Sequence, residues 1–405
     1  MIPCKVSATA AARRRHPSRS TSVDVVVIGG GFAGVSTAAA LAREGLTDGL
    51  ILEREVICGS HASGRNAAIA RQVELDPILS TLALRGVRAL KEKVANGQPI
   101  LRRTGALYLM QATSQFQTDT LRAQLEGKQT HAQWFSTVEA RRLFTFLEAF
   151  TFDHAIWSPA DGVVDIHALL SDLLMEARCH GLKSVTGRPV ESLIIDKSVV
   201  RGVRTADGEI YCRIVVDATG AWAGRLGRQA YPLPLRSYRR HLFVSDRRGL
   251  IGGDDPVVWD LDIGYYVRPE GPGLLLCPCD ETIYPPGVPA IDFEAEMLLA
   301  DKLTNYVPKL ADIALRRRWA CLRTFTPDRR PLIGWDPDLK GLFHVSGLGG
   351  FGVTTSLAVG ELASARICNR AVDWIDVEAF SASRHAIRTH GAEWSPNGAE
   401  GQIQA

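Results

Sequence analysis

The 405-residue sequence predicts an α/β fold in which a domain with a parallel sheet is interrupted by an α+β domain with an antiparallel sheet. From residue 23 onwards, strand-like and helix-like runs alternate, which is typical of βαβ units. Residues 236–325 are instead mostly strand-like and rich in Tyr, which favours a separate antiparallel sheet.

The first elements form a βαβ unit. β-Branched residues predict a strand over 23–28, and Ala-rich composition predicts a helix over 32–44 that ends at Gly45. An apolar run predicts the next strand over 50–53. Later elements are an amphipathic helix over 167–180, strands over 192–195, 199–205 and 209–216 with Asp207-Gly208 as a hairpin turn, and a last helix over 353–368.

The net charge of +3 is local. Residues 1–22 hold five basic residues and no acid, and subtracting these five from 47 leaves 42 basic against 44 acidic residues elsewhere. We therefore expect no nucleic-acid partner. No run approaches the roughly 20 apolar residues of a transmembrane helix. The basic tail is expected to be a disordered extension. It also resembles an organellar transit peptide, so an organellar matrix is the alternative to a cytoplasmic location.

The strongest motif is the G-x-G-x-x-G of residues 29–34, which follows the first strand and opens a helix. Its glycines allow a tight turn and the close approach of a pyrophosphate, and the helix N-terminus offers free N–H groups to that anion. Glu53 lies 19 residues beyond Gly34, the spacing of a carboxylate that binds a ribose 2′-OH. This acid disfavours a 2′-phosphate, so the motif predicts FAD or NAD. No metal site is predicted.

Four further stretches choose between these cofactors: residues 53–55 with 63–68, residues 215–222, residues 319–328, and the Gly-rich residues 347–352. In this order they resemble FAD-dependent amine and amino-acid oxidoreductases of the D-amino-acid oxidase family. That family includes glycine oxidase, sarcosine oxidase and D-amino-acid dehydrogenases, and the similarity is nearest to the D-arginine type. With the first glycine motif, the resemblance covers about residues 23–375.

The resemblance implies FAD as cofactor. The polar turn at 63–66 would donate hydrogen bonds to the diphosphate, and the loop at 347–352 would direct a helix N-terminus at negative charge on the reduced flavin. For residues 63–66 the alternative is a surface loop, and for residues 218–220 it is plain helix–sheet packing. The predicted cofactor residues are Gly29, Gly31, Phe32, Ala33, Gly34, Glu53, Arg54, Ser63, Gly64, Arg65, Asn66, Val190, Ala218, Gly220, Trp222, Gly347, Gly349, Gly350, Phe351, Gly352 and Val353.

A second group of residues is predicted to bind the substrate. Arg323 follows an apolar run, and a buried Arg needs an anion or a carboxylate partner. In the resemblance, Arg323 and Arg240 contact the substrate carboxylate and Tyr266 faces the substrate. For Arg240, a solvated basic cluster with Arg236 and Arg239 is an equal alternative.

Three positions bear on the chemistry. Cys321 aligns with a cysteine to which some sarcosine oxidases attach flavin covalently, although an inert buried thiol is the preferred interpretation. Arg71 and Glu74 depart from the D-arginine-type pattern, so they either tune substrate choice or form a surface salt bridge. Leu275 occupies the position of a lysine thought to assist oxygen reactivity, which favours a dehydrogenase over an oxidase.

The expected reaction is oxidation of the C–N bond of a D-amino acid or N-substituted amino acid by hydride transfer to flavin N5. The imine product then hydrolyses to an oxo acid, and the electron acceptor is unknown. One alternative is a 2-hydroxy-acid dehydrogenase, which would need a base such as His61 or His241. Another is a flavin-binding subunit of a larger complex, so homo- and hetero-oligomers are both open.

The predicted organisation is discontinuous. Residues 23–95, 155–225 and 326–375 are assigned to a Rossmann-like FAD-binding domain. Residues 96–154 and 226–325 are assigned to the substrate domain. Residues 376–405 form a C-terminal extension.

Overall fold

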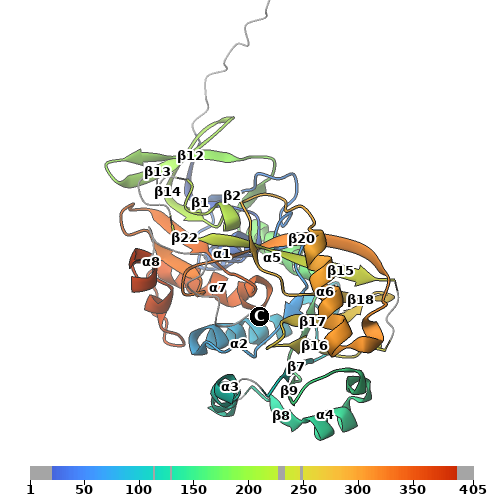
Figure 1. The fold of residues 1–405 in the computed structure, drawn as a ribbon. Coiled ribbons are helices and arrows are strands. Elements are labelled where there is room, and N and C mark those ends of the chain that lie inside the picture. The colour runs from blue at the N-terminus through green and yellow to red at the C-terminus, as the bar shows by residue number, and fades with distance from the viewer. Residues whose placement is uncertain (1–20, 113–114, 128–129, 227–232, 247–249, 390–405) are drawn as a thin grey trace, which may run out of the picture.

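The computed structural model describes residues 21–112, 115–127, 130–226, 233–246 and 250–389. Residues 1–20 of the predicted tail lie outside these ranges, whereas residues 21 and 22 already belong to the first strand. Two large sheets lie at opposite ends of the molecule with helices packed around them (Figure 1). Within the described ranges, no helix is long and apolar enough to cross a membrane.

The first sheet is the predicted parallel one. Val25–Ile28 of β1 pair with β2 on one side and with the end of β14 on the other, and β14 also pairs with β22. The first half of β14 continues into an antiparallel hairpin with β13 and β12. The strands are β1 (Thr21–Ile28), β2 (Gly49–Leu52), β11 (Lys183–Val185), β12 (Val190–Asp196), β13 (Val199–Thr205), β14 (Gly208–Asp217), β21 (Leu332–Trp335) and β22 (Leu342–Ser346).

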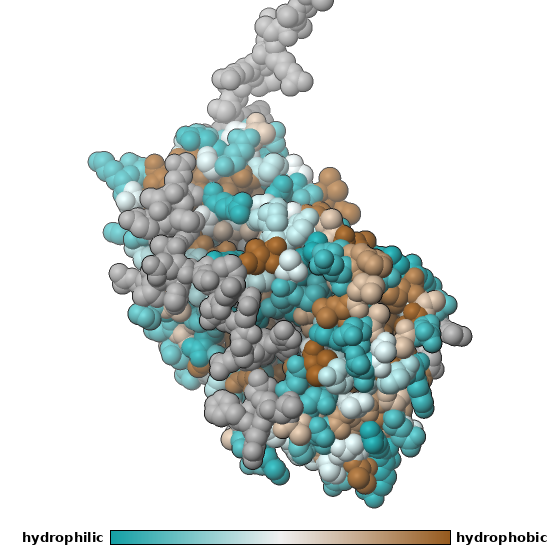
Figure 2. All heavy atoms as spheres, in the orientation of Figure 1, coloured by the Kyte–Doolittle hydropathy of each residue, from teal (hydrophilic) through white to brown (hydrophobic). Residues whose placement is uncertain are grey.

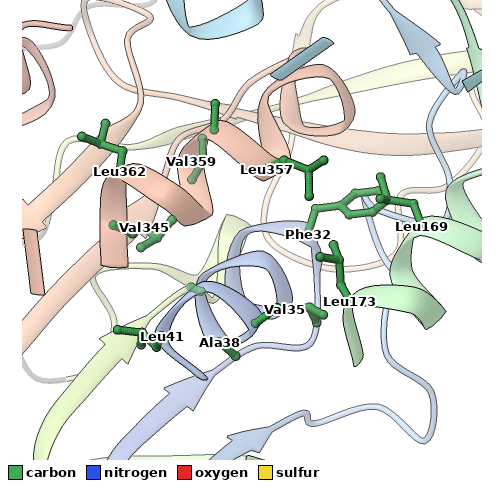
Figure 3. Close-up of a cluster of buried hydrophobic side chains, with 14 of the residues drawn as sticks. Phe32, Val35, Ala38, Leu41, Leu169, Leu173, Val345, Leu357, Val359 and Leu362 are labelled. Carbon is green, nitrogen blue, oxygen red and sulfur yellow. The ribbon is translucent and has the colours of Figure 1, made fainter. Parts of the chain in front are cut away.

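Both faces of this sheet are buried, as expected of parallel strands. Along β1, Val25 and Val27 face the helices, whereas Val26 and Ile28 face the side of the β12–β13 hairpin. On the helical side, Phe32 and Val35 of α1 pack against leucines of α5 and α7 (Figure 3). The helices are α1 (Phe32–Arg43), α2 (Pro77–Lys91), α5 (Ile166–Cys179) and α7 (Gly352–Ile367).

The second sheet confirms the predicted antiparallel sheet, with one parallel pair between β7 and β16. Its two faces alternate along each strand. Tyr265 and Val267 pack on the side of helix α6, and Tyr266 lies on the opposite face with Trp259 and Cys277. The strands are β7 (Ala106–Met110), β8 (Gln133–Ser136), β9 (His154–Ser158), β15 (Arg236–Ser245), β16 (Val257–Asp260), β17 (Tyr265–Glu270), β18 (Gly273–Cys277), β19 (Thr282–Ile283) and β20 (Leu315–Phe325).

Smaller elements connect the two sheets. A three-stranded sheet joins β3, β10 and β6, and β4 pairs with β5. The remaining strands are β3 (Ile69–Ala70), β4 (Val94–Ala95), β5 (Gln98–Pro99), β6 (Leu101–Arg102) and β10 (Gly162–Val164). The remaining helices are α3 (Gln115–Gly127), α4 (Thr137–Leu143), α6 (Phe293–Tyr306), α8 (His385–Thr389) and 3-10 turns at Thr145–Ala149, Gly220–Trp222, Pro308–Leu310 and Val377–Phe380.

The architecture positions four of the predicted motifs together. The carboxyl ends of β1, β2, β14 and β22 lie at one edge of the first sheet and lead directly into Gly29, Glu53, Ala218 and Gly347. Ligands of such sheets bind at this edge. On the molecular face seen in Figure 2, apolar residues are scattered between polar ones. We propose the predicted domain division with one adjustment, since β9 (His154–Ser158) pairs within the second sheet.

Candidate functional site

A cavity of about 320 Å³ lies between the edge of the first sheet and the inner face of the second. Its volume is within the range of small-molecule sites. The cavity is lined by the predicted cofactor and substrate residues with three exceptions, which are Gly34, Gly64 and Phe351. The structure therefore brings together segments from residue 28 to residue 353 at one site.

The first glycine turn is shaped by backbone packing. Gly29 has a φ of +110°, and a Cβ there would meet the carbonyl oxygen of Ala218 at 2.4 Å. A Cβ on Gly34 would meet the carbonyl oxygen of Gly29 at 2.0 Å. Gly34 thus acts by letting α1 approach the turn, and only its neighbours line the cavity.

Glu53 is held at the edge of the sheet by two backbone donors. Its Oε2 accepts from the N–H of Gly30 at 2.7 Å, and its Oε1 accepts from the N–H of Glu55 at 2.9 Å. The side chain is buried and lines the cavity. Because each carboxylate oxygen can accept a second hydrogen bond, a fixed Glu53 can still bind a ribose hydroxyl.

The polar turn at residues 63–66 stands over the start of α1. The hydroxyl of Ser63 accepts from the N–H of Phe32 at 2.9 Å. Asn66 holds the turn itself, since its Nδ2 donates to the carbonyl of Ser63 and its Oδ1 accepts from the N–H of Ala68. At the adjacent wall, the guanidinium of Arg54 lies 4.8 Å from the ring centroid of Trp222.

Helices α1 and α7 both open onto the cavity. Neither has a side-chain N-cap or an acidic residue in its first turn. The loop before α7 is fixed by a hydrogen bond from the N–H of Gly349 to the carbonyl of Thr324 at 2.9 Å. The cavity therefore receives the positive ends of two helices, which attract negative charge.

These features fit FAD. The N-terminus of α1 could hold the diphosphate, Glu53 could bind the ribose, and the N-terminus of α7 could stabilise the flavin edge. Val190 also lines the cavity, together with Arg188.

Arg323 lies at the opposite end of the site from the diphosphate turn, on the inner face of the second sheet. Its guanidinium is buried, with 7% of the residue exposed, and it lines the cavity. Its side-chain contacts are the Sγ of Cys321 at 2.9 Å and the carbonyl of Leu322 at 3.4 Å. Among the described residues, no carboxylate forms an ion pair with Arg323, so its charge is available to a ligand.

Arg240 lines the same cavity but differs in its partners. It is buried and not part of a solvated cluster, so that alternative is wrong. Its Nη2 donates to Glu281 at 2.7 Å and its Nε donates to the carbonyl of Asp280 at 3.1 Å. Arg240 therefore reaches the substrate end with most of its charge balanced by Glu281.

Tyr266 lies between these arginines and an aromatic wall that the sequence did not single out. Its ring centroid lies 4.7 Å from that of Trp259, the residue opposite it on β16. Burial raises the pKa of Tyr266 well above its usual value, so the hydroxyl stays protonated and can donate a hydrogen bond. Trp259 could have been found from the apolar run that surrounds it at residues 257–260.

Cys321 is buried beside Arg323 and lines the cavity. Burial raises the pKa of its thiol, with nearby Arg323 acting in the opposite direction. A protonated thiol is a poor nucleophile. The geometry therefore agrees with the expectation that Cys321 is inert.

Arg71 and Glu74 form an ion pair of 3.1 Å. It is not a surface salt bridge, because the two side chains are only 5% and 8% exposed, so that alternative is wrong. The guanidinium of Arg71 lies between the rings of Trp259 and Phe351 and lines the cavity.

The two histidines considered as bases have other partners. His241 is fully buried, with Nδ1 at 2.7 Å from Asp280 Oδ2 and Nε2 accepting from the N–H of Asp292 at 2.9 Å. His61 lies against Trp222, with ring centroids 4.8 Å apart, and 3.0 Å from Glu55. His61 lines the cavity, whereas His241 does not.

Comparisons with known proteins show which family this chain resembles. The family model described as DAO, FAD dependent oxidoreductase, matches residues 24–366. The mitochondrial dimethylglycine dehydrogenase of Rattus norvegicus is 25% identical over 389 residues, which cover 89% of this chain and 43% of the relative. The mitochondrial pyruvate dehydrogenase phosphatase regulatory subunit of Mus musculus is 23% identical, over 88% of this chain and 42% of the relative. The chain thus spans less than half the length of both.

A solved structure shows the same fold. The L-proline dehydrogenase from P. horikoshii superposes with a TM-score of 0.78 at 23% identity, covering 89% of this chain and 97% of that chain.

Proposed function

This chain belongs to the DAO family of FAD-dependent oxidoreductases, and we propose that it oxidises the C–N bond of a D-amino acid or an N-substituted amino acid. The observation that carries the proposal is Arg323, a buried guanidinium without an acidic partner among the described residues, in the cavity that fits FAD. The similarity to dimethylglycine dehydrogenase, whose name gives an N-methylated amino acid as its substrate, supports the same substrate class.

Each residue has a separate task in this mechanism. Arg323 binds the substrate carboxylate through paired N–H groups, and Tyr266 donates a hydrogen bond from its protonated hydroxyl. The buried ring of Trp259, which lines the cavity, would help to exclude water from this end. Bound FAD would accept a hydride at N5 from the substrate carbon that bears the amine. The imine formed from the substrate then hydrolyses in water to an oxo acid and ammonia or an amine.

No protein base is required if the amine enters neutral. An apolar cavity that carries guanidinium groups disfavours a second cation, so it favours deprotonation of the bound amine. Of the two histidine candidates for a base in a hydroxy-acid enzyme, His241 does not line the cavity, and His61 lines it against Trp222 with Glu55 as its partner. This arrangement supports amine oxidation over the 2-hydroxy-acid alternative.

The test is an anaerobic titration of the purified holoenzyme with D- and L-amino acids, N-methyl amino acids and 2-hydroxy acids. Loss of the oxidised flavin absorbance with amino compounds is the expected result. Reduction by hydroxy acids alone would overturn the proposal.

We propose a dehydrogenase that uses an acceptor other than O2, because Leu275 is buried in the apolar cluster beside Tyr266 and brings no cation there. Reoxidation of the reduced flavin should be faster with an artificial dye than with air-saturated buffer. A rapid O2 reaction would show an oxidase.

A second candidate is a flavin-carrying part of a larger assembly. The chain spans under half the length of the dimethylglycine dehydrogenase and of the phosphatase regulatory subunit that it resembles, and the second of these is named as a subunit. Full turnover by the isolated chain would exclude this role, whereas activity that appears only with partner chains would support it. A mitochondrial relative makes an organellar matrix the alternative to the proposed cytoplasmic location.

A further inference from the structure

The cavity carries a further guanidinium, that of Arg71, in an unusual setting. The Cζ of Arg71 lies 4.4 Å from the ring centroid of Trp259 and 4.2 Å from that of Phe351. The residue is 4% exposed, and its backbone N–H is anchored to the hydroxyl of Thr354 in α7. Two aromatic faces and a helix therefore fix the group at the cavity wall.

The hydrogen-bonding capacity of Arg71 is only partly used. Glu74 accepts one bond from Nη2, at 3.1 Å, and does not itself line the cavity. The buried Nε has no partner among the described residues. A guanidinium has five N–H donors, so most of those on Arg71 are not accounted for by Glu74.

Arg71 and Arg323 reach the same cavity from its two walls. Trp259 contacts both Arg71 and Tyr266, and Tyr266 in turn lies close enough to Arg323 for the guanidinium charge to act on its hydroxyl. These pairwise contacts join Phe351, Arg71, Trp259, Tyr266 and Arg323 into one chain of neighbours. A small substrate held by Arg323 would extend past Tyr266 towards Arg71.

The position of Arg71 also determines which substrate side chains are disfavoured. Aromatic rings can receive a cationic group of a ligand. Here the rings of Trp259 and Phe351 are already occupied by the protein's own guanidinium, which lies over both. A distal ammonium or guanidinium on the substrate would therefore meet like charge, whereas a distal carboxylate would meet a donor.

We infer that Arg71 binds a second carboxylate of the substrate, so that the enzyme acts on an amino dicarboxylate, either a dicarboxylic amino acid or an N-carboxyalkyl amino acid. The inference rests on the proposed function and names its substrate class. Glu74 is a positioning residue that orients Arg71 and competes with the substrate for its charge.

The role of Glu74 separates this inference from a purely structural ion pair. Replacing Glu74 by Gln frees Arg71, so binding of the second carboxylate should strengthen. Replacing both residues in an Arg71→Met/Glu74→Gln variant leaves no unpaired buried charge, yet it removes the carboxylate site. Two variants that break the same ion pair should therefore change the preference in opposite directions.

The catalytic test compares kcat/KM within two pairs of substrates. The first pair is glutamate and glutamine, each as both enantiomers, and the second is N-(carboxymethyl)glycine and N-methylglycine. The acid of each pair should be preferred by about tenfold or more. The preference should rise in E74Q and fall to near unity in R71M/E74Q. Arg85 provides a matched control, because its guanidinium also lies over a Trp ring and pairs with an acid, Glu361, but does not line the cavity. Arg85→Met should therefore leave the preference unchanged.

A binding test does not depend on turnover. Glutarate should raise the melting temperature of the holoenzyme more than pentanoate does, and this difference should disappear in R71M/E74Q but not in R85M. Equal protection by the two acids, or an unchanged preference in both cavity variants, would overturn the inference. If no amino compound reduces the flavin, the proposed function fails, whereas equal reduction by acids and amides refutes only the second carboxylate site.

Discussion

Replacing Arg323 by Met should separate activity from stability. Two charge-assisted hydrogen bonds to a substrate carboxylate contribute about 3 kcal/mol, since each is worth at least about 1.5 kcal/mol. At 1.4 kcal/mol per factor of ten, kcat/KM should fall about 100-fold. Among the described residues, the hydrogen-bond partners of the guanidinium are a sulfur atom and a carbonyl 3.4 Å away. Losing a buried cation without an acidic partner should leave the melting temperature unchanged or raise it.

Arg268 provides the matched comparison. It is buried to a similar extent, but its Nε donates to the carbonyl of Ala67 at 2.8 Å, and its Nη1 donates to the carbonyl of Pro269 and to Glu270. Arg268→Met leaves buried acceptors unsatisfied and should cost about 2–4 kcal/mol of stability. The assays are steady-state kinetics with the best amino substrate and thermal unfolding of both holoenzyme variants. If Arg323→Met unfolds at a temperature as low as Arg268→Met, Arg323 is a structural residue and the reasoning is refuted.

Three further predictions concern buried titratable groups. Burial alone would lower the pKa of His344, but Asp217 at 3.6 Å and Asp336 at 2.8 Å raise it. The resulting stabilisation is complete below the unfolded pKa of about 6.5 and is lost as pH rises through the higher folded pKa. In His344→Gln, the melting temperature should therefore depend less on pH over that range. Burial raises the pKa of Asp260 from 3.8 to about 6, so stability should fall as pH rises from about 4 to about 6, and Asp260→Asn should remove this slope. The thiol of Cys321 should stay unreacted, so acid precipitation should release all flavin to the supernatant, and yellow colour in the washed pellet would contradict this.

Local patterns predicted much of the first sheet because each of its strands and helices has a clear periodicity of its own. The strand at 199–205 has the predicted bounds, and α1 and α7 each begin within one residue of the predicted start. Helix α2 was missed although Asp76 caps it and Pro77 occupies its first turn, which is a recognisable start signal. Helix α6 was missed because the surrounding region reads as strand, and its start depends on Asp292, whose carboxylate accepts from the N–H of Glu294.

The charges of the site could not be assigned from sequence, because they depend on which acid each arginine meets. The register of β15 and β20 places Arg240 opposite Cys321 and Tyr238 opposite Arg323. The two arginines therefore lie on one face of the sheet, with one residue pair between them. Glu281, 41 residues beyond Arg240, pairs with Arg240 and with Arg329, and no acid in the described part of the chain pairs with Arg323. Neither the spacing nor the composition of these segments distinguishes the balanced guanidinium from the available one. The site therefore follows from a strand register that only the folded chain defines, whereas the residue types that it uses are already evident in the sequence.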